Sequence, residues 1–166
     1  CTPLYYNAGL AEPLAHGYLT VYYRKIGENS NMVHDHAQAA IEYVQQGVGV
    51  ENHHCQYIMA SFYDYGILRT RDARRAMALW LLAAEGGHSM AQFALGSKYF
   101  IGIGGVIEDK YDSFKWFEKS ADQGFAMAQF WVGHCYENGH GCEMDLERAG
   151  VYYDLAAQQG QTSLLS

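Results

Sequence analysis

Histidine side chains are the first candidates for chemistry in this chain, because they bind metals and transfer protons near neutral pH. Two short clusters occur, His34-Asp35-His36 and His53-His54. Residues two positions apart lie on different faces of a helix, so His34 and His36 could share a metal ion only from a loop. No further ligands stand at a useful spacing. We therefore expect capping or surface roles, and a histidine-based metal-binding domain is only a minor alternative.

The cysteines are the candidate nucleophiles and disulfide partners: Cys1, Cys55, Cys135 and Cys142. They form no Cys-x-x-Cys pair and no zinc spacing. Cys135 and Cys142 are close enough in sequence for a local disulfide, and separate buried thiols are the alternative. A chain that begins with cysteine resembles a mature bacterial lipoprotein, whose first cysteine carries the lipid. Lipidation of Cys1 is therefore one reading, and an arbitrary chain boundary is the other.

The sequence contains none of the short motifs that mark the common enzyme classes. There is no Gly-x-Ser-x-Gly elbow, no phosphate-binding loop ending in Lys-Ser or Lys-Thr, and no His-Glu-x-x-His. The glycine-rich residues 102–105 follow an expected helix rather than a strand, which makes them a turn. Glu108 and Asp109 could form a carboxylate pair, but adjacent acids at a helix start are more simply a cap. We predict that the protein is not an enzyme and uses no cofactor.

Composition indicates a packed protein with an acidic surface. Hydrophobic residues make up 49% of the 166 residues and charged residues 17%, which is enough apolar material for a core. The net charge of −7 argues against nucleic acid as a partner. No apolar run reaches the roughly 20 residues that span a bilayer. Membrane contact is therefore expected only through a lipid on Cys1.

An internal repeat supplies the elements that would position any site. Residues 91–96 (AQFALG) return 37 positions later as 128–133 (AQFWVG), and 55–60 (CQYIMA) hold the same place 36 positions earlier. In the second half of each copy, an aspartate precedes an apolar pair, two small residues and a glycine. These aspartates are Asp72, Asp109 and Asp145. A divergent fourth copy is expected ahead of the other three.

Each copy has the pattern of two helices joined by a turn. Ala91, Leu95 and Tyr99 fall on one stripe of the first helix. Gly102 is expected to end that helix in the left-handed conformation, and Asp109 to cap the next helix. One helix pair cannot bury its own apolar face, whereas stacked copies cover each other. The sequence predicts one all-α solenoid domain over 1–166, with repeats at 15–51, 52–87, 88–125 and 126–163.

The repeat pattern resembles the Sel1-like repeat family, a relative of the tetratricopeptide repeats. The copy at 88–125 carries the resemblance best, through Ala91, Leu95-Gly96, Tyr99 and Gly102. The copy before it lacks the Gly-x-Gly turn. The resemblance implies a right-handed α/α superhelix whose concave face binds other proteins. It also implies an adaptor or scaffold, and many bacterial members of the family work in the envelope or are secreted.

The helical positions that lie beside the packing stripe predict the partner-binding face. In tetratricopeptide-like stacking the first helices line the concave surface, and these positions are mostly aromatic or apolar. They are Tyr18, Tyr22, Lys25, Ile58, Phe62, Tyr65, Lys98, Ile101, Trp131 and Asn138. We predict a non-enzymatic protein–protein interaction scaffold of the bacterial envelope, in the periplasm or secreted. A permanent structural subunit of a larger envelope or secretion assembly is the alternative.

Overall fold

The computed structural model describes residues 52–67 and 71–165, with side chains through Gly160. Further toward the N-terminus it describes Gly17, 19–22, Arg24, Gly27, 36–38, Ala40, Ile41 and Val44. All of these except Gly27 are helical. Across these described ranges there is no strand.

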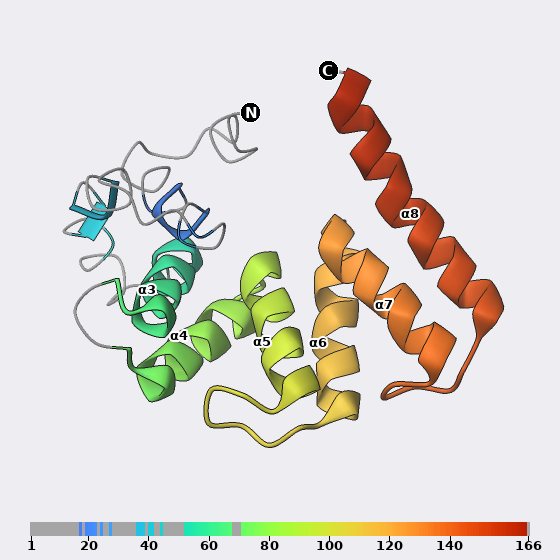
Figure 1. Ribbon diagram of the computed structural model, residues 1–166, viewed down its shortest axis with the longest axis horizontal. Helices are drawn as coiled ribbons and strands as arrows, with labels where there is room; N and C mark the ends of the chain where they lie inside the picture. The colour runs from blue at the N-terminus through green and yellow to red at the C-terminus, as the bar shows by residue number, and fades with distance from the viewer. Residues whose placement is uncertain are drawn as a thin grey trace. The chain divides into compact units, whose positions relative to one another are not determined.

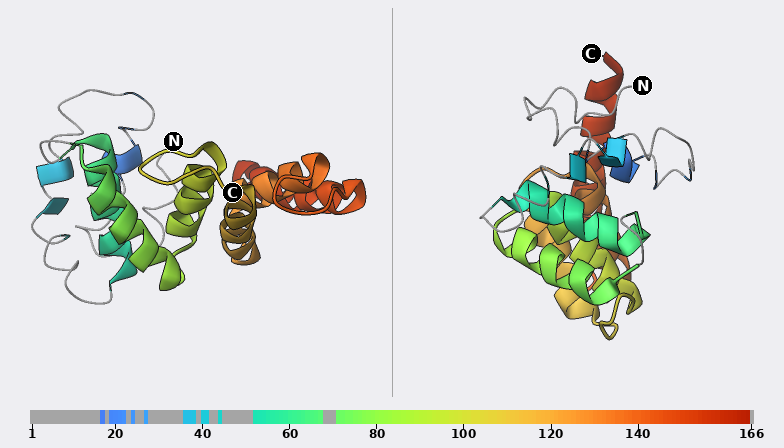
Figure 2. Two further views of the ribbon diagram at one scale, coloured as in Figure 1. Left: turned by 90° about the horizontal axis from the view of Figure 1, so that it is seen from below. Right: turned by 90° about the vertical axis from the view of Figure 1, so that its left-hand side faces the viewer.

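The labelled helices belong to two compact units, and within each unit successive helices pack against each other (Figure 1). The N-terminal unit, Cys1–Gly86, holds α3 (His53–Tyr65) and α4 (Ala73–Glu85). The C-terminal unit, Gly87–Ser166, holds the remaining four helices. These are α5 (Ser89–Ile101), α6 (Lys110–Asp122), α7 (Ala126–Asn138) and α8 (Leu146–Leu165). Figure 2 shows the same helices from two further directions.

The turn inside each helix pair is built in the same way three times. The first helix ends on a glycine with positive φ, at 67°, 76° and 68° for Gly66, Gly102 and Gly139. The aspartate N–H before the second helix then donates to a tyrosine carbonyl near the end of the first helix. These pairs are Asp72 to Tyr63 at 3.0 Å, Asp109 to Tyr99 at 2.9 Å, and Asp145 to Tyr136 at 2.9 Å.

The aspartates also cap the second helices, as predicted for Asp109. The Asp109 carboxylate accepts from the backbone N–H groups of Tyr111 at 2.9 Å and Asp112 at 3.0 Å. Asp72 and Asp145 each accept one such bond at 3.0 Å, from Arg75 and Arg148. These orphan N–H groups have no partner within the helix, so the carboxylates fix where α4, α6 and α8 begin.

The core of the C-terminal unit depends on close approach between helices. A Cβ at Gly96 of α5 would lie 2.5 Å from the Phe117 ring of α6, so only glycine lets that ring reach its place. Gly133 of α7 does the same for Tyr153 of α8, where the added Cβ would lie 3.0 Å from the ring. Phe117 is completely buried and packs in a cluster with Phe114, Val132 and Tyr136.

The core of the N-terminal unit is centred on α3, whose residues 55–62 are all buried. Tyr57, Ile58 and Phe62 are its largest fully buried side chains. Gly17 lies against Ile58, since a Cβ there would come within 2.9 Å of the Ile58 side chain. α3 is therefore covered on more than one side, unlike a helix that lies on the surface of a bundle.

Candidate protein-binding surface

The structure divides the predicted binding face into buried and exposed residues. Ile58 and Phe62 are 0% exposed, so they are core residues and cannot line a free surface. Lys98 is also buried. Tyr22 and Tyr65 are half-buried, whereas Ile101 is 60% exposed and Asn138 is also exposed. Tyr18 and Lys25 lie outside the described residues. Partner binding by the exposed members stays a prediction.

Trp131 is held by aromatic neighbours of its own unit. Its ring stacks on Phe117 at a centroid distance of 5.6 Å and meets the edge of Phe100 at 5.2 Å. The helical wheel placed Trp131 beside the α7 packing stripe. That side of α7 is not free, because it packs against α6. Trp131 therefore contributes to the packing between repeats.

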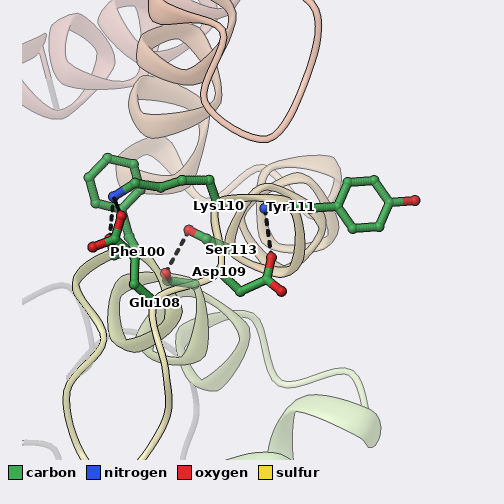
Figure 3. A network of polar contacts seen from close by, with 7 residues as sticks. Phe100, Glu108, Asp109, Lys110, Tyr111 and Ser113 are labelled. Carbon is green, nitrogen blue, oxygen red and sulfur yellow. Dashed lines mark hydrogen bonds and ion pairs between the residues drawn. The ribbon is translucent and has the colours of Figure 1, made fainter.

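The residues with catalytic chemistry have structural partners. Glu108 forms an ion pair with Lys110 at 3.1 Å, and Asp109 caps α6, so each of the two acids has a structural partner of its own (Figure 3). Lys110 lies over the Phe100 ring, 3.5 Å from its centroid, and donates to the Phe100 carbonyl. His53 lies 3.1 Å from the Gln56 side-chain oxygen.

The histidines and cysteines are the remaining candidates for a metal site or a disulfide. Within the described part of the chain, no three histidine, cysteine or acidic side chains gather as a metal ion would require. Cys55, Cys135 and Cys142 are free thiols. Burial raises the pKa of the Cys135 thiol to about 12, which keeps it protonated and weakly nucleophilic. Cys1 and His34 lie outside the described residues.

A groove between α7 and α8 is a surface feature that the sequence interpretation missed. It has a volume of about 640 Å³ and is lined by Ala126, Met127, Phe130, Glu137, Tyr153, Ala156 and Ala157. Met127 is 53% exposed and Phe130 48%, which is high for large apolar side chains. The repeat register could have revealed it, because Glu137 stands where the preceding repeat has Phe100.

One polar pair crosses this groove. The Tyr153 hydroxyl donates to the Glu137 carboxylate at 2.8 Å. Burial, and then this hydrogen bond, raise the pKa of Tyr153 to about 12. Tyr153 therefore remains a neutral donor at physiological pH, and the Glu137 side chain accepts its hydrogen bond at the edge of an apolar groove. Such a surface can hold an apolar side chain together with a cation.

Known proteins share this repeat. The Sel1 repeat model matches three consecutive segments, residues 53–88, 89–125 and 126–161. The chain belongs to the Sel1 repeat family. The three Sel1 repeats coincide with the helix pairs α3–α4, α5–α6 and α7–α8. The predicted divergent repeat at 15–51 lies outside these matches and mostly outside the described residues, so it stays a prediction.

Curated relatives carry their Sel1 repeats within much longer proteins. A chitin synthase regulator SKT5 of Malassezia restricta is 31% identical over 106 residues, which is 63% of this chain and 7% of the relative. The ERAD-associated E3 ubiquitin-protein ligase component HRD3B of Arabidopsis thaliana is 31% identical over 102 residues. That match covers 61% of this chain and 17% of the relative. The chain thus spans a small part of these proteins.

Solved Sel1 structures share the fold. The Sel1 repeat protein from Oxalobacter formigenes has a TM-score of 0.69 and 32% identity, covering 72% of this chain and 90% of that one. The antigen c5321 of uropathogenic Escherichia coli has a TM-score of 0.68 and 31% identity, covering 72% of this chain and 25% of that one. The predicted fold class, an all-α solenoid of helix-turn-helix repeats, is confirmed.

Proposed function

We propose that this Sel1 repeat chain is a non-enzymatic scaffold that binds another protein. The observation that carries the proposal is the repeat itself. Three Sel1 repeats match, and relatives that share them are named as regulators of chitin synthase or as a ubiquitin-ligase component. Those names describe proteins that act through other proteins. A helical repeat suits this role because it exposes extended helix faces at low cost in stability.

Exposed members of the predicted binding face are available in the C-terminal unit for this purpose. Ile101 of α5 and Asn138 of α7 occupy equivalent positions in successive repeats, each directly before the glycine that ends its helix. Ile101 is 60% exposed, and an aliphatic side chain on a helix end is a suitable apolar anchor. A partner with an apolar side chain near this edge would bury it.

The test is capture of a protein partner by the immobilised chain, followed by affinity measurement with surface variants. Ile101→Glu should weaken binding about tenfold or more if Ile101 is an anchor. Ile107→Glu is the matched control, because Ile107 is 88% exposed on the turn between α5 and α6 and lies off the predicted face. Equal effects of the two variants, or the absence of any saturable protein partner, would contradict the proposal.

The cellular location of the scaffold is a separate prediction. The curated relatives named above are fungal and plant proteins, whereas the two solved neighbours are bacterial. The comparisons therefore do not favour the bacterial envelope over another location. No helix in the described segments is long and apolar enough to cross a membrane. Envelope association through lipidation of Cys1 is tested by intact mass after metabolic labelling with a fatty acid, comparing the chain with Cys1→Ser.

A further inference from the structure

The first helices of the three matched repeats begin at equivalent residues, namely Asn52, His88 and Phe125. The backbone is the same at all three, because each carbonyl accepts an N–H from a glutamine four positions later at 3.0 Å. The side chains differ. Asn52 accepts from the Cys55 N–H at 3.1 Å, and His88 accepts from the Ala91 N–H at 3.2 Å through Nδ1. Phe125 makes no side-chain capping bond. The N-cap of α5 is therefore the one of the three that can titrate.

The hydrogen bond from Ala91 fixes the protonation state of the His88 ring. A neutral imidazole has one acceptor nitrogen, so a ring that accepts at Nδ1 carries its hydrogen on Nε2. A protonated imidazole carries hydrogens on both nitrogens and can only donate. Protonation would set the Nδ1 hydrogen against the Ala91 N–H and leave that donor of the first turn without its acceptor. The cap therefore exists only while His88 is neutral.

The position of His88 adds two further costs to its protonation. The residue is 9% exposed, so a charged ring would lose most of its hydration. It also stands at the N-terminus of α5, where the partial positive charge of the helix disfavours a cation. Residues 89–92, the first turn of α5, include no acid that would offset the charge. Both effects favour the same neutral state that the hydrogen bond requires.

Neutral polar groups of α6 hold the start of α5 from the side. The two helices pack against each other. The Ser120 hydroxyl donates to the Ser89 carbonyl at 2.8 Å, and the Gln123 amide donates to the Gln92 side-chain oxygen at 2.7 Å. Neither serine nor glutamine titrates, so these contacts do not depend on pH. His88 is thus a pH-dependent part of a helix start whose contacts with α6 are constant.

The ionisable groups near this end of α6 have other neighbours. Lys119 lies over a tryptophan ring of its own helix, 4.3 Å from the ring centroid. Glu118 and Asp122 act electrostatically on Tyr152 of α8. Glu85, the last residue of α4 and three positions before His88, is exposed. These acids therefore lie toward α8 or toward solvent.

We infer that His88 is a pH-sensitive N-cap, which orders the first turn of α5 when its ring is neutral and releases that turn when the ring is protonated. α5 is the first helix of the C-terminal unit, so the release is a local opening of that unit. The folded state favours the neutral ring, so the unfolded chain binds more protons as the pH falls. The stability that the cap contributes is complete well above about pH 6.5, the ordinary pKa of histidine, and is lost as the pH falls below it.

Two variants taken from the chain's own repeats test this inference. His88→Asn copies the non-titrating cap at Asn52, and His88→Phe copies the uncapped start at Phe125. Urea unfolding of the full chain is followed between about pH 8 and about pH 5. Loss of a cap changes the unfolding equilibrium constant by about fivefold. We expect the unmodified chain to lose about this factor relative to His88→Asn as the pH falls, since the other histidines are common to both. His88→Phe should follow the pH dependence of His88→Asn.

Nitrogen NMR at His88 separates a capping histidine from one that is merely buried. At about pH 8 the ring should carry its hydrogen on Nε2. The Ala91 amide signal should shift on acidification in the unmodified chain but not in His88→Asn. If His88→Phe does not fold, His88→Ala takes its place. Parallel pH profiles of the unmodified chain and His88→Asn, a hydrogen on Nδ1 at about pH 8, or an unchanged Ala91 signal would each overturn the inference.

Discussion

Gly96 offers a quantitative test of how the repeats pack, because its backbone touches the ring of a core phenylalanine. A methyl group in Gly96→Ala would lie 2.5 Å from Cδ1 and 2.7 Å from Cε1 of Phe117. Ordinary contacts of this kind are about 3.5–4.0 Å, so the ring would have to move by about 1 Å. Phe117 is fully buried. The ring centroids of Trp131 and Phe93 lie 5.6 and 5.5 Å from the Phe117 centroid. These neighbouring rings restrict its movement.

Two opposing terms set the expected free energy for Gly96→Ala. Overpacking a core costs about 1–3 kcal/mol, whereas alanine gains about 1 kcal/mol of helix propensity over glycine. With a ring this tightly held the steric term is expected near its upper end. The variant should therefore lose about 1–2 kcal/mol of unfolding free energy. For a chain of this size, 1 kcal/mol corresponds to a fall of roughly 2–4 °C in Tm.

Gly150 is the matched control, because it lies within α8 and nothing approaches a Cβ there within 4 Å. Gly150→Ala should gain about 0.5–1 kcal/mol from helix propensity alone. Gly133→Ala should fall between the two, since its Cβ would lie 3.0 Å from the half-buried Tyr153 ring. Urea unfolding followed by tryptophan fluorescence measures the order. If Gly96→Ala stabilised the chain as much as Gly150→Ala, the close-packing argument would be refuted.

Other predictions follow from capping, burial and titration. Asp109→Ala should lower the free energy of unfolding in urea by about 1 kcal/mol, because two backbone N–H groups lose their acceptor. The control Asp112→Ala should lower it by less, and equal losses would contradict the capping role of Asp109. Phe62→Ala should lower the free energy of unfolding by about 3–5 kcal/mol because Phe62 is buried, whereas Ile101→Ala should change it by less than about 0.5 kcal/mol because Ile101 is exposed. Thermal melts of the two variants can tell these effects apart. Burial raises the pKa of Cys135 from 9.0 and of Tyr57 from 10.0, each to about 12. Folding thus favours the protonated forms of these two groups. Their contribution to the unfolding free energy should be constant below about pH 9 and should fall as the pH rises toward 12, and a flat profile between pH 9 and 12 would be evidence against the burial of these groups. A thiol reagent at pH 8 should label half-buried Cys142 before buried Cys135, as peptide mapping would show; simultaneous labelling would count against the burial.

The local features of the fold could be predicted from the sequence because they depend on neighbours in the chain. A glycine at 102 can adopt positive φ regardless of the tertiary fold, and an aspartate at 109 can accept from N–H groups two and three residues ahead. Repetition of these signals about every 37 residues gave the helix pairs and the family resemblance. The same reasoning identified Ala91 and Leu95 as buried, and both are 0% exposed.

The surface could not be predicted in the same way, because exposure depends on which helix covers which face. A helical wheel gives the angle between Ile58, Phe62 or Trp131 and the packing stripe, but it does not show that other helices lie on that side too. The groove likewise depends on how α7 and α8 pack against each other, because its lining residues come from both helices. The sequence by itself determined the helices, turns and caps, since these come from backbone conformations and hydrogen bonds between residues near in the chain. Only the tertiary structure decided which side chains are core and which can meet a partner, because burial is a property of helices brought together from distant positions.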